Sequence, residues 1–261
     1  MSRIVPHQKL YDDAKALDKW QAITLILAAI FTFTSITLNI LKEVHVSLKG
    51  NIYVDIVDGS TSLLAVVYIV FEVLVSSKLY KAEKARRTDL IDHSFSTNFS
   101  GQQSSGYYNS GGINPGVYKI AVNGFENSLF SSSTAKKMTT MKWVAASVVL
   151  IIFLLSAFMG EKLILNSLIQ VAAAGVLVQQ AIKLQLFSDR INKIHEDFKT
   201  LFSNMRDETD KTKREGEMVR NVLNYETTIS SAGIILDSTI FFKHNDELSR
   251  SWEKMKQDYK I

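Results

Sequence analysis

The sequence predicts an all-α membrane protein with four transmembrane helices arranged as two hairpins. Four apolar stretches occur as two pairs with a polar segment between the pairs: Trp20–Leu41 with Gly59–Ser77, and Trp143–Gly160 with Leu163–Ile182. Three of them run 18 to 22 residues without a formally charged side chain, and the exception contains Glu72. Because a bilayer core needs about 20 apolar residues of helix, each stretch is long enough to span it.

These stretches divide the 261 residues into five segments. We expect a cytoplasmic N-terminal helix (1–19), a first transmembrane hairpin (20–77), a cytoplasmic insert (78–142), a second transmembrane hairpin (143–182) and a cytoplasmic, coiled-coil-like helical tail (183–261). Lys and Arg number four, nine and fourteen in the N-terminal segment, the insert and the tail, against three in the two outer connections. This excess predicts that both termini lie in the cytoplasm, and the N-terminal region is expected to be a retained anchor.

Composition argues against several classes of site. The chain has no cysteine, so a disulfide, a thiol nucleophile and a thiolate metal site are excluded. Its five histidines occur singly without ligand spacing, and we expect no metal site. The contiguous Asp92–His93–Ser94 cannot adopt triad geometry, so we expect no catalytic residues and no enzyme. We attribute the net charge of +4 to topology and anionic lipid, without direct nucleic-acid binding.

Polar residues inside the spans are the candidates for a pore or gate. A carboxylate at the depth of Glu72 costs about 2.5 kcal/mol or more unless it is protonated, paired or hydrated. Glu72 either faces a lumen or gate, or snorkels inward or bonds an adjacent helix. The fourth span carries four amides that either line a pore or bond to neighbouring helices: Asn166, Gln170, Gln179 and Gln180.

Two other features near the membrane leave alternatives open. The first span is rich in Thr and Ser, whose hydroxyls either bond back to their own helix or make contacts with other helices or water. The outer stretch Asn51–Val57 alternates in polarity, which is typical of a short strand but also fits an irregular re-entry into the membrane. A turn of about two residues, Glu161–Lys162, joins the last two spans.

The cytoplasmic insert begins with a basic, helix-compatible run at Lys78–Arg87. A solvated face or a contact with anionic lipid explains this run, whereas a phosphate or ligand contact through Arg86, Arg87 and Lys119 is the sharper alternative. Residues 96–116 are rich in Ser, Gly and Asn and predict a loop that matches no phosphate-binding motif. Apolar residues three and four apart then predict a helix over Val117–Met138.

The tail contains a heptad seam, which continues to Met205: Leu184, Phe187, Ile191, Ile194, Phe198 and Leu201. This spacing predicts that the fourth span continues as a helix into a cytoplasmic bundle, formed within the subunit or with a symmetry mate. A charged, solvated stretch follows at Arg206–Arg220. In the last segment, Asn245–Ile261, one apolar helix face is expected to dock on the bundle or on a partner.

The order of these parts resembles the SMODS-associated four-transmembrane pore-forming effectors, a family of bacterial antiphage defence proteins. The similarity covers almost the whole chain as a layout. Locally it rests on the Lys- and Ala-rich helix Lys81–Arg87 leading to Ile91–Asp92, and on Tyr225–Phe242 followed by a charged final helix. Ser94–Phe99 stands where the Leu-Pro-Trp motif of the family is expected.

The resemblance implies a multi-pass effector of the bacterial inner membrane in a CBASS-like abortive-infection system. Such an effector works with a nucleotidyltransferase or another sensor protein, and a cyclic or oligonucleotide messenger is its activating ligand. It forms a homo-oligomer and forms or opens a pore in the lipid bilayer. The alternative function is a membrane-anchored adaptor or sensor that recruits a cytoplasmic partner without a pore. A membrane-embedded enzyme is disfavoured, because intramembrane chemistry normally needs more than one ionisable group.

Overall fold

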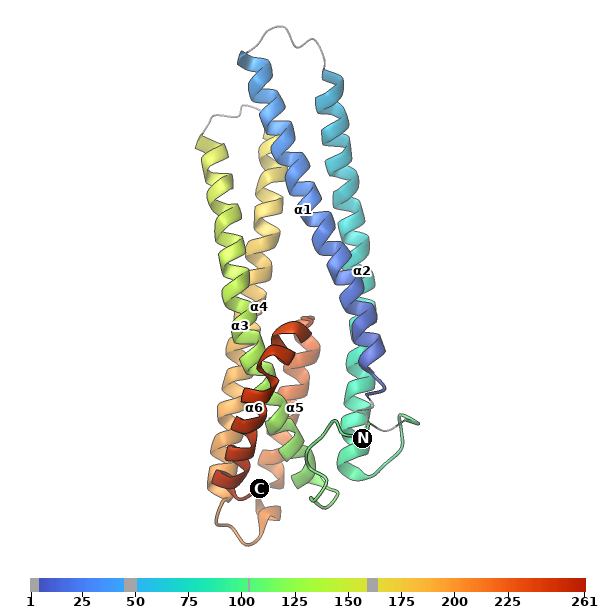
Figure 1. Cartoon of the computed structure of the whole chain (residues 1–261), viewed down its shortest axis with the longest axis vertical. Helices are drawn as coiled ribbons and strands as arrows, with labels where there is room; N and C mark the ends of the chain where they lie inside the picture. The colour runs from blue at the N-terminus through green and yellow to red at the C-terminus, as the bar shows by residue number, and fades with distance from the viewer. Residues whose placement is uncertain (1–4, 45–50, 103, 159–163) are drawn as a thin grey trace. The chain divides into compact units, whose positions relative to one another are not determined.

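The computed structural model describes residues 5–44, 51–102, 104–158 and 164–261. Within these ranges the chain is helical and contains no β-strand. Figure 1 shows the helices in chain order: α1 (Gln8–Val44), α2 (Asn51–Phe95), α3 (Val117–Phe158), α4 (Ile164–Met205), the short 3-10 helix η1 (Lys211–Arg214), α5 (Glu215–Ala232) and α6 (Ser238–Tyr259). The predicted all-α class is confirmed.

The helices contribute to two compact units. Unit 1 consists of residues 1–12, 78–140 and 183–261, and unit 2 consists of residues 13–77 and 141–182. Helices α1 to α4 therefore each supply residues to both units. Two unit boundaries, 77/78 and 182/183, coincide with the predicted ends of the second and fourth spans.

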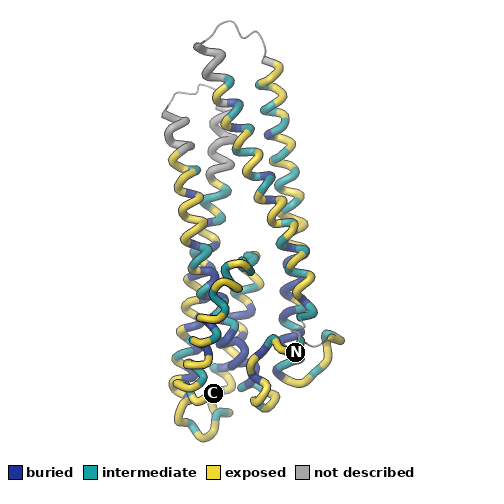
Figure 2. The backbone as a smooth tube through the Cα atoms, viewed as in Figure 1, coloured by how far each residue is buried: buried dark blue, intermediate teal, exposed yellow. Residues whose placement is uncertain are grey.

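Two helices among the described residues are long and apolar enough to cross a membrane, within Gln8–Ser35 and Ile52–Phe95. A core helix of a soluble domain would be mostly buried, but only 17% and 11% of their most apolar windows are buried. Figure 2 shows exposed residues along much of α2, and its exposed apolar side chains include Leu63, Val66 and Ile69. Parts of the third and fourth predicted spans lie outside the described residues.

The predicted outer segment at 42–58 is largely helical. Helix α1 continues to Val44 and α2 already begins at Asn51, so both alternatives for Asn51–Val57, a short strand and an irregular re-entry, are wrong. A helix satisfies each backbone N–H within its own segment, whereas a lone strand needs a partner, and seven alternating residues do not decide between them. The predicted turn at Glu161–Lys162 lies outside the described residues.

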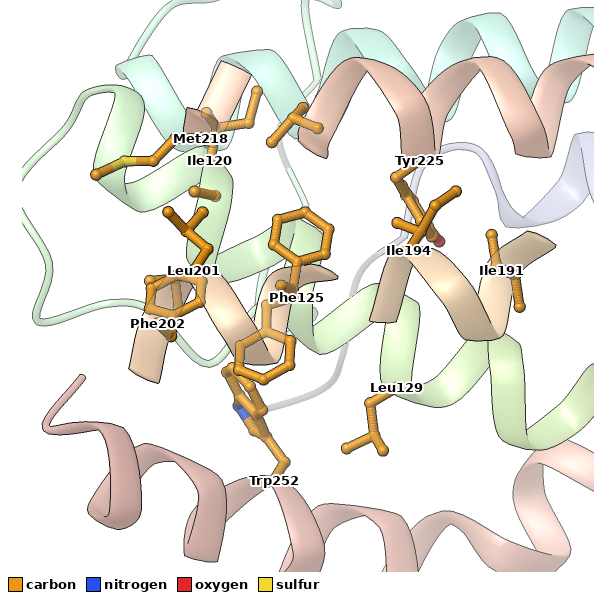
Figure 3. Packing of buried hydrophobic residues seen from close by; sticks show 14 of the residues in the cluster. Ile120, Phe125, Leu129, Ile191, Ile194, Leu201, Phe202, Met218, Tyr225 and Trp252 are labelled. Atoms are coloured by element: carbon orange, nitrogen blue, oxygen red, sulfur yellow. The ribbon is translucent and has the colours of Figure 1, made fainter. Parts of the chain in front are cut away.

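Unit 1 has an aromatic core between α3, α4 and α6 (Figure 3). The ring of Phe125 stacks on Phe202 with 5.1 Å between centroids and meets Trp252 edge-on at 5.4 Å. A Cβ at Gly124 would lie 3.0 Å from the Phe198 ring, so the absence of a side chain at Gly124 allows α3 and α4 to approach closely. Such contacts fill the core at close-packed density.

The heptad seam of the tail lies inside this core. Ile191 and Phe198 are fully buried, and the other seam residues are at most 6% exposed. The seam packs with residues of α3, α5 and α6 in the same chain, so its apolar surface is not available to a symmetry mate. The final helix docks on the same bundle through Leu248 and Trp252. The charged stretch Arg206–Arg220 differs from its prediction, because α5 begins at Glu215 and Met218 is fully buried.

We predict that Leu201→Ala destabilises unit 1 strongly, whereas Leu223→Ala does not. Leu201 is 2% exposed and its truncation leaves a cavity, which costs about 2–5 kcal/mol. Leu223 lies on α5 and is 56% exposed, so the same substitution should change stability by less than about 0.5 kcal/mol. Thermal unfolding of the full chain in detergent measures both, and equal losses would contradict the assignment of the core.

A second prediction concerns His195, whose Nδ1 lies 3.0 Å from the Ser128 hydroxyl inside the core. Burial lowers the pKa of His195 from 6.5 to about 4, so the fold keeps the ring neutral while the unfolded chain protonates it. The stability is complete above pH 6.5 and should fall by about 3 kcal/mol as the pH drops to 4. His195→Gln should flatten this loss in unfolding curves recorded across that range. His244→Gln, on the partly exposed side of α6, is the matched control and should leave it unchanged.

Candidate functional site

Six polar side chains of unit 2 form a cluster to which all four long helices contribute. We call it the inner cluster, and it consists of Asp18 and Gln21 of α1, Tyr68 and Glu72 of α2, Lys142 of α3 and Gln180 of α4. Each residue lies within about three turns of the predicted cytoplasmic end of its span. Antiparallel helices in the predicted even-span arrangement place these ends at one depth.

A chain of hydrogen bonds runs through the inner cluster. The amide of Gln21 donates to the Glu72 carboxylate, and Gln21 also bonds the Tyr68 hydroxyl. The Gln180 Nε2 donates to the same hydroxyl at 3.3 Å, while the Lys142 ammonium donates to Gln180 Oε1 at 3.4 Å. The Tyr68 hydroxyl and the Gln180 amide therefore link α1, α2, α3 and α4.

The charges of the inner cluster are mixed. The Asp18 carboxylate interacts electrostatically with the Lys142 ammonium and with Glu72. Two carboxylates and one ammonium give a formal excess of negative charge, which attracts cations. Glu72 remains exposed although Gln21, its partner, is only 5% exposed. The inner cluster therefore combines oxygen and nitrogen ligand atoms with a net negative charge.

The hydroxyls of α1 take both of the predicted roles. Thr24 and Thr32 donate to backbone carbonyls four residues earlier, at 2.9 and 2.8 Å. Ser35 instead donates to the Asp58 carboxylate of α2 at 2.7 Å. This second contact lies toward the predicted outer ends of the first two spans, so α1 and α2 are held together at both ends by side-chain hydrogen bonds.

The predicted pore residues have different positions. Glu72 and Gln180 belong to the inner cluster. Glu72 bonds Gln21 on the adjacent helix, which is one of the two roles predicted for it. Gln179 is exposed. The side chains of Asn166 and Gln170 lie outside the described part of the chain. A pore role for these residues stays a prediction.

Four members of the inner cluster were not predicted from the sequence: Asp18, Gln21, Tyr68 and Lys142. Asp18 and Lys142 lie just beyond the predicted apolar spans, so the spans alone contain no ionisable partner for Glu72. Comparing polar residues at the same predicted depth on all four spans would have found these four residues.

Arg86, a predicted phosphate contact, is buried in unit 1 and bonded to carboxylates. Its terminal nitrogens donate to both oxygens of Glu226, at 3.1 and 2.6 Å, and its Nε donates to Glu83 at 3.1 Å. Burial lowers the pKa of Arg86, but the two carboxylates outweigh this effect and raise it well above its usual value. A phosphate could bind Arg86 only by displacing Glu226. In this structure the Arg86–Glu226 ion pair joins α2 to α5.

The other two predicted ligand contacts lie in the same unit. Arg87 is 42% exposed at its side chain and lies 3.5 Å from Glu226. Lys119 is buried at the start of α3 and lowers the pKa of His93 together with burial, which is the larger cause. Arg86 and Arg87 thus share the Glu226 carboxylate as their partner.

The first residues of the loop at 96–116 are bonded to the buried carboxylate of Asp92, and Ser104 farther along donates to Asp89. Asp92 accepts hydrogen bonds from the Thr97 hydroxyl at 2.7 Å, the Phe99 amide at 2.8 Å, and the Ser100 amide and hydroxyl at 2.8 and 2.6 Å. Although burial alone raises the pKa of Asp92, these bonds outweigh it and hold the pKa at about 2. These bonds tie residues 97–100 to the end of α2.

Asp92, His93 and Ser94 bond to different partners. The Asp92 oxygens face the loop, His93 Nε2 lies 3.2 Å from the Ser110 hydroxyl, and Ser94 accepts from the Asn123 amide at 3.1 Å. Ser110 itself donates to Asn123 at 2.6 Å. These bonds join α2, the loop and α3. Among the residues that the structure describes, no group of three or more His, Asp or Glu side chains could hold a metal ion.

The chain was compared with protein-family models, curated proteins and solved structures, and none of the three comparisons gave a match.

We predict that Asp92→Asn releases the loop at 96–116 at neutral pH. The new amide NH₂ faces donors from Ser100 and leaves them unpaired, which costs about 1–3 kcal/mol. Hydrogen exchange at the Phe99 and Ser100 amides of the full chain should speed up accordingly. In the wild type, protection should persist above pH 3.8 and be lost as the pH falls toward 2, because the pKa is depressed in the fold.

The matched control is Asp246→Asn, which changes an exposed carboxylate of α6 in the same way. It should leave loop exchange unaltered. Unchanged exchange in Asp92→Asn would show that the loop does not depend on this carboxylate.

Proposed function

We propose that the protein is a membrane effector whose four long helices span the bilayer and open an ion path. The observation that carries the proposal is the inner cluster, in which polar side chains of four helices meet while the surrounding helix surface is apolar and exposed. A helix that serves only as an anchor needs no polar contacts of this kind, because lipid satisfies its apolar surface. Polar residues inside membrane spans usually mark ion or substrate paths.

The four-span topology supports the proposal through the position of the inner cluster. The topology predicts that the cytoplasmic ends of the spans lie near Trp20, Ser77, Trp143 and Ile182. The residues of the inner cluster lie close to these four positions in the sequence. The two helices that pass the length and composition test, α1 and α2, form the first hairpin. In this topology the protein is a multi-pass protein of the bacterial inner membrane with both termini in the cytoplasm.

Unit 1 is the proposed receiver of the activating signal. It is built from the ends of α2, α3 and α4 together with α5 and α6, and its seam residues lie on the same helix as Gln180. Because residues of the seam and Gln180 both belong to α4, we place the signal's route from the seam to the inner cluster in this helix. By resemblance to the four-transmembrane effectors, the signal is a cyclic or oligonucleotide messenger from a partner nucleotidyltransferase.

A homo-oligomer is part of the proposal, but not through the heptad seam. Because the seam is buried inside its own subunit, subunits would meet through other surfaces. The exposed apolar faces of the long helices are available for this contact as well as for lipid. The adaptor function, with a sealed bundle and a recruited soluble partner, is the competing proposal.

We predict that Gln180→Leu raises ion leakage through the unstimulated protein about tenfold, which corresponds to loss of about 1.4 kcal/mol of closed-state stabilisation. The reason is that Gln180 bonds both Tyr68 and Lys142. The neighbouring Gln179 is exposed and lies outside the inner cluster, so Gln179→Leu separates the two predicted roles. Unchanged leakage would assign the closed-state bonds to Gln180, and equal leakage would support a pore role for Gln179. Ion flux from vesicles that contain the purified full chain measures both variants.

Glu72→Gln tests the ion path in the same vesicles, because it keeps the side-chain shape and removes the charge. The reversal potential should shift toward a lower preference for cations. Identical flux and selectivity in Gln180→Leu, Glu72→Gln and wild type would exclude the inner cluster as a gate. Absence of flux from wild-type protein, with and without cyclic oligonucleotides, would favour the adaptor.

A further inference from the structure

The connection between α5 and α6, together with the start of α6, carries an apolar surface that does not lie wholly within the core. Six of the nine residues at 234–242 are apolar. Ile234 and Leu236 pack against the core of unit 1, and Phe241 packs on Phe130 with 5.5 Å between ring centroids. Phe242 instead is 63% exposed, and Ile235 and Ile240 are half-buried. We call residues 234–242 the apolar turn.

The apolar turn is held in one conformation. Gly233 ends α5 with a φ of 60°, in the left-handed region that favours glycine. Asp237 then caps α6 by accepting a hydrogen bond from the Thr239 amide at 2.7 Å. A fixed turn presents Phe242 without an ordering cost on binding, which a flexible loop would have to pay.

One contact fixes where on α3 the apolar turn lies. The Asp237 amide donates to the Met138 sulfur at 3.3 Å, so the turn is beside the last residues of α3 in unit 1. Helix α3 reaches Trp143, the predicted start of its span, five residues after Met138. At 1.5 Å per residue this is about 8 Å along the helix.

The surroundings of the apolar turn match a membrane interface. Lys243 follows Phe242, and Lys136 and Lys137 precede Met138 on α3. Aromatic side chains beside lysines are typical of the headgroup region, where the ring enters the apolar boundary and the ammonium meets anionic lipid. A second copy of the chain or a soluble partner would not require the turn to lie next to a span entry.

We infer that the apolar turn is an interfacial anchor that inserts Phe242 into the cytoplasmic headgroup region of the bilayer. The inference rests on the proposed function only in requiring that α3 enters the membrane near Trp143. It adds a lipid contact within unit 1, which the four spans do not supply. Insertion at this site makes the position of α6, and of Trp252 in the core, dependent on the lipid surface.

Single-cysteine labelling tests the inference, since the chain has no cysteine of its own. Phe242→Cys is labelled with an environment-sensitive nitrobenzoxadiazole dye in the full chain, which is then reconstituted in phosphatidylcholine–phosphatidylglycerol vesicles with and without brominated phosphatidylcholine. We expect brominated lipid to quench about half of the emission, because interfacial groups lie about 5–10 Å into the headgroup boundary. Ile235→Cys provides a second label on the same turn.

Two reference positions make the outcome decisive. Lys254→Cys lies on an exposed part of α6, about 18 Å from Phe242 along the helix, and should not be quenched. Val148→Cys lies in the third span and should be quenched strongly.

Quenching at Val148→Cys but not at either turn position would overturn the interfacial anchor and leave the span intact. Absence of quenching at Val148→Cys would overturn the proposed span and the anchor with it. Blue-shifted emission at Phe242→Cys without quenching would show that protein covers the turn, which also overturns the inference.

Discussion

The exposed apolar surface of α2 is the constraint on which the rest of the structure depends. Hydration of apolar surface costs about 25 cal/mol per Å², and side chains such as Leu63, Val66 and Ile69 are each more than half exposed. A water-soluble fold would bury them against other helices, as it does the seam of α4. Their exposure together with the paired polar side chains between helices is the inverse of a soluble bundle, and it is the arrangement that lipid favours.

The four long helices differ along their length in which side chains they bury. In unit 1 the apolar side chains of α3 and α4 form a buried core that the hydrophobic effect stabilises. Charged side chains such as Lys193 face outward, whereas Arg86 and Lys119 are buried beside this core. In unit 2 apolar side chains such as Val66 are exposed, whereas Gln21 is buried and its amide bonds a neighbouring helix. The boundaries between the two units lie at 77/78 on α2 and at 182/183 on α4.

Sequence patterns predicted the elements whose physics is local. Apolar length predicted the helices, and the spacing of three and four residues predicted α4 and the face of α6 with Trp252. Helix α5 was missed because charges and Asn side chains surround Met218 and Val222, although the spacing from Met218 to Tyr225 is helical. The bond between Arg86 and Glu226 joins residues 140 positions apart, and no local pattern contains such a contact. The same is true of the inner cluster, whose members are assigned only when the depths of all four spans are compared.

Under the proposed function, the hydrogen bonds of the inner cluster set the free energy that opening of the path requires. Its bonds from Gln21 to Glu72, from Gln180 to Tyr68 and from Lys142 to Gln180 each contribute about 0.5–1.5 kcal/mol net, so separating the helices costs a few kcal/mol. Water that enters an open path replaces part of these bonds and lowers the cost further. A messenger shifts such an equilibrium only by its difference in affinity for the two states, and a difference of about 5.5 kcal/mol converts a 1:99 population into 99:1. Under the proposed function, opening therefore requires an activating ligand whose affinities for the closed and open states differ by only a few kcal/mol.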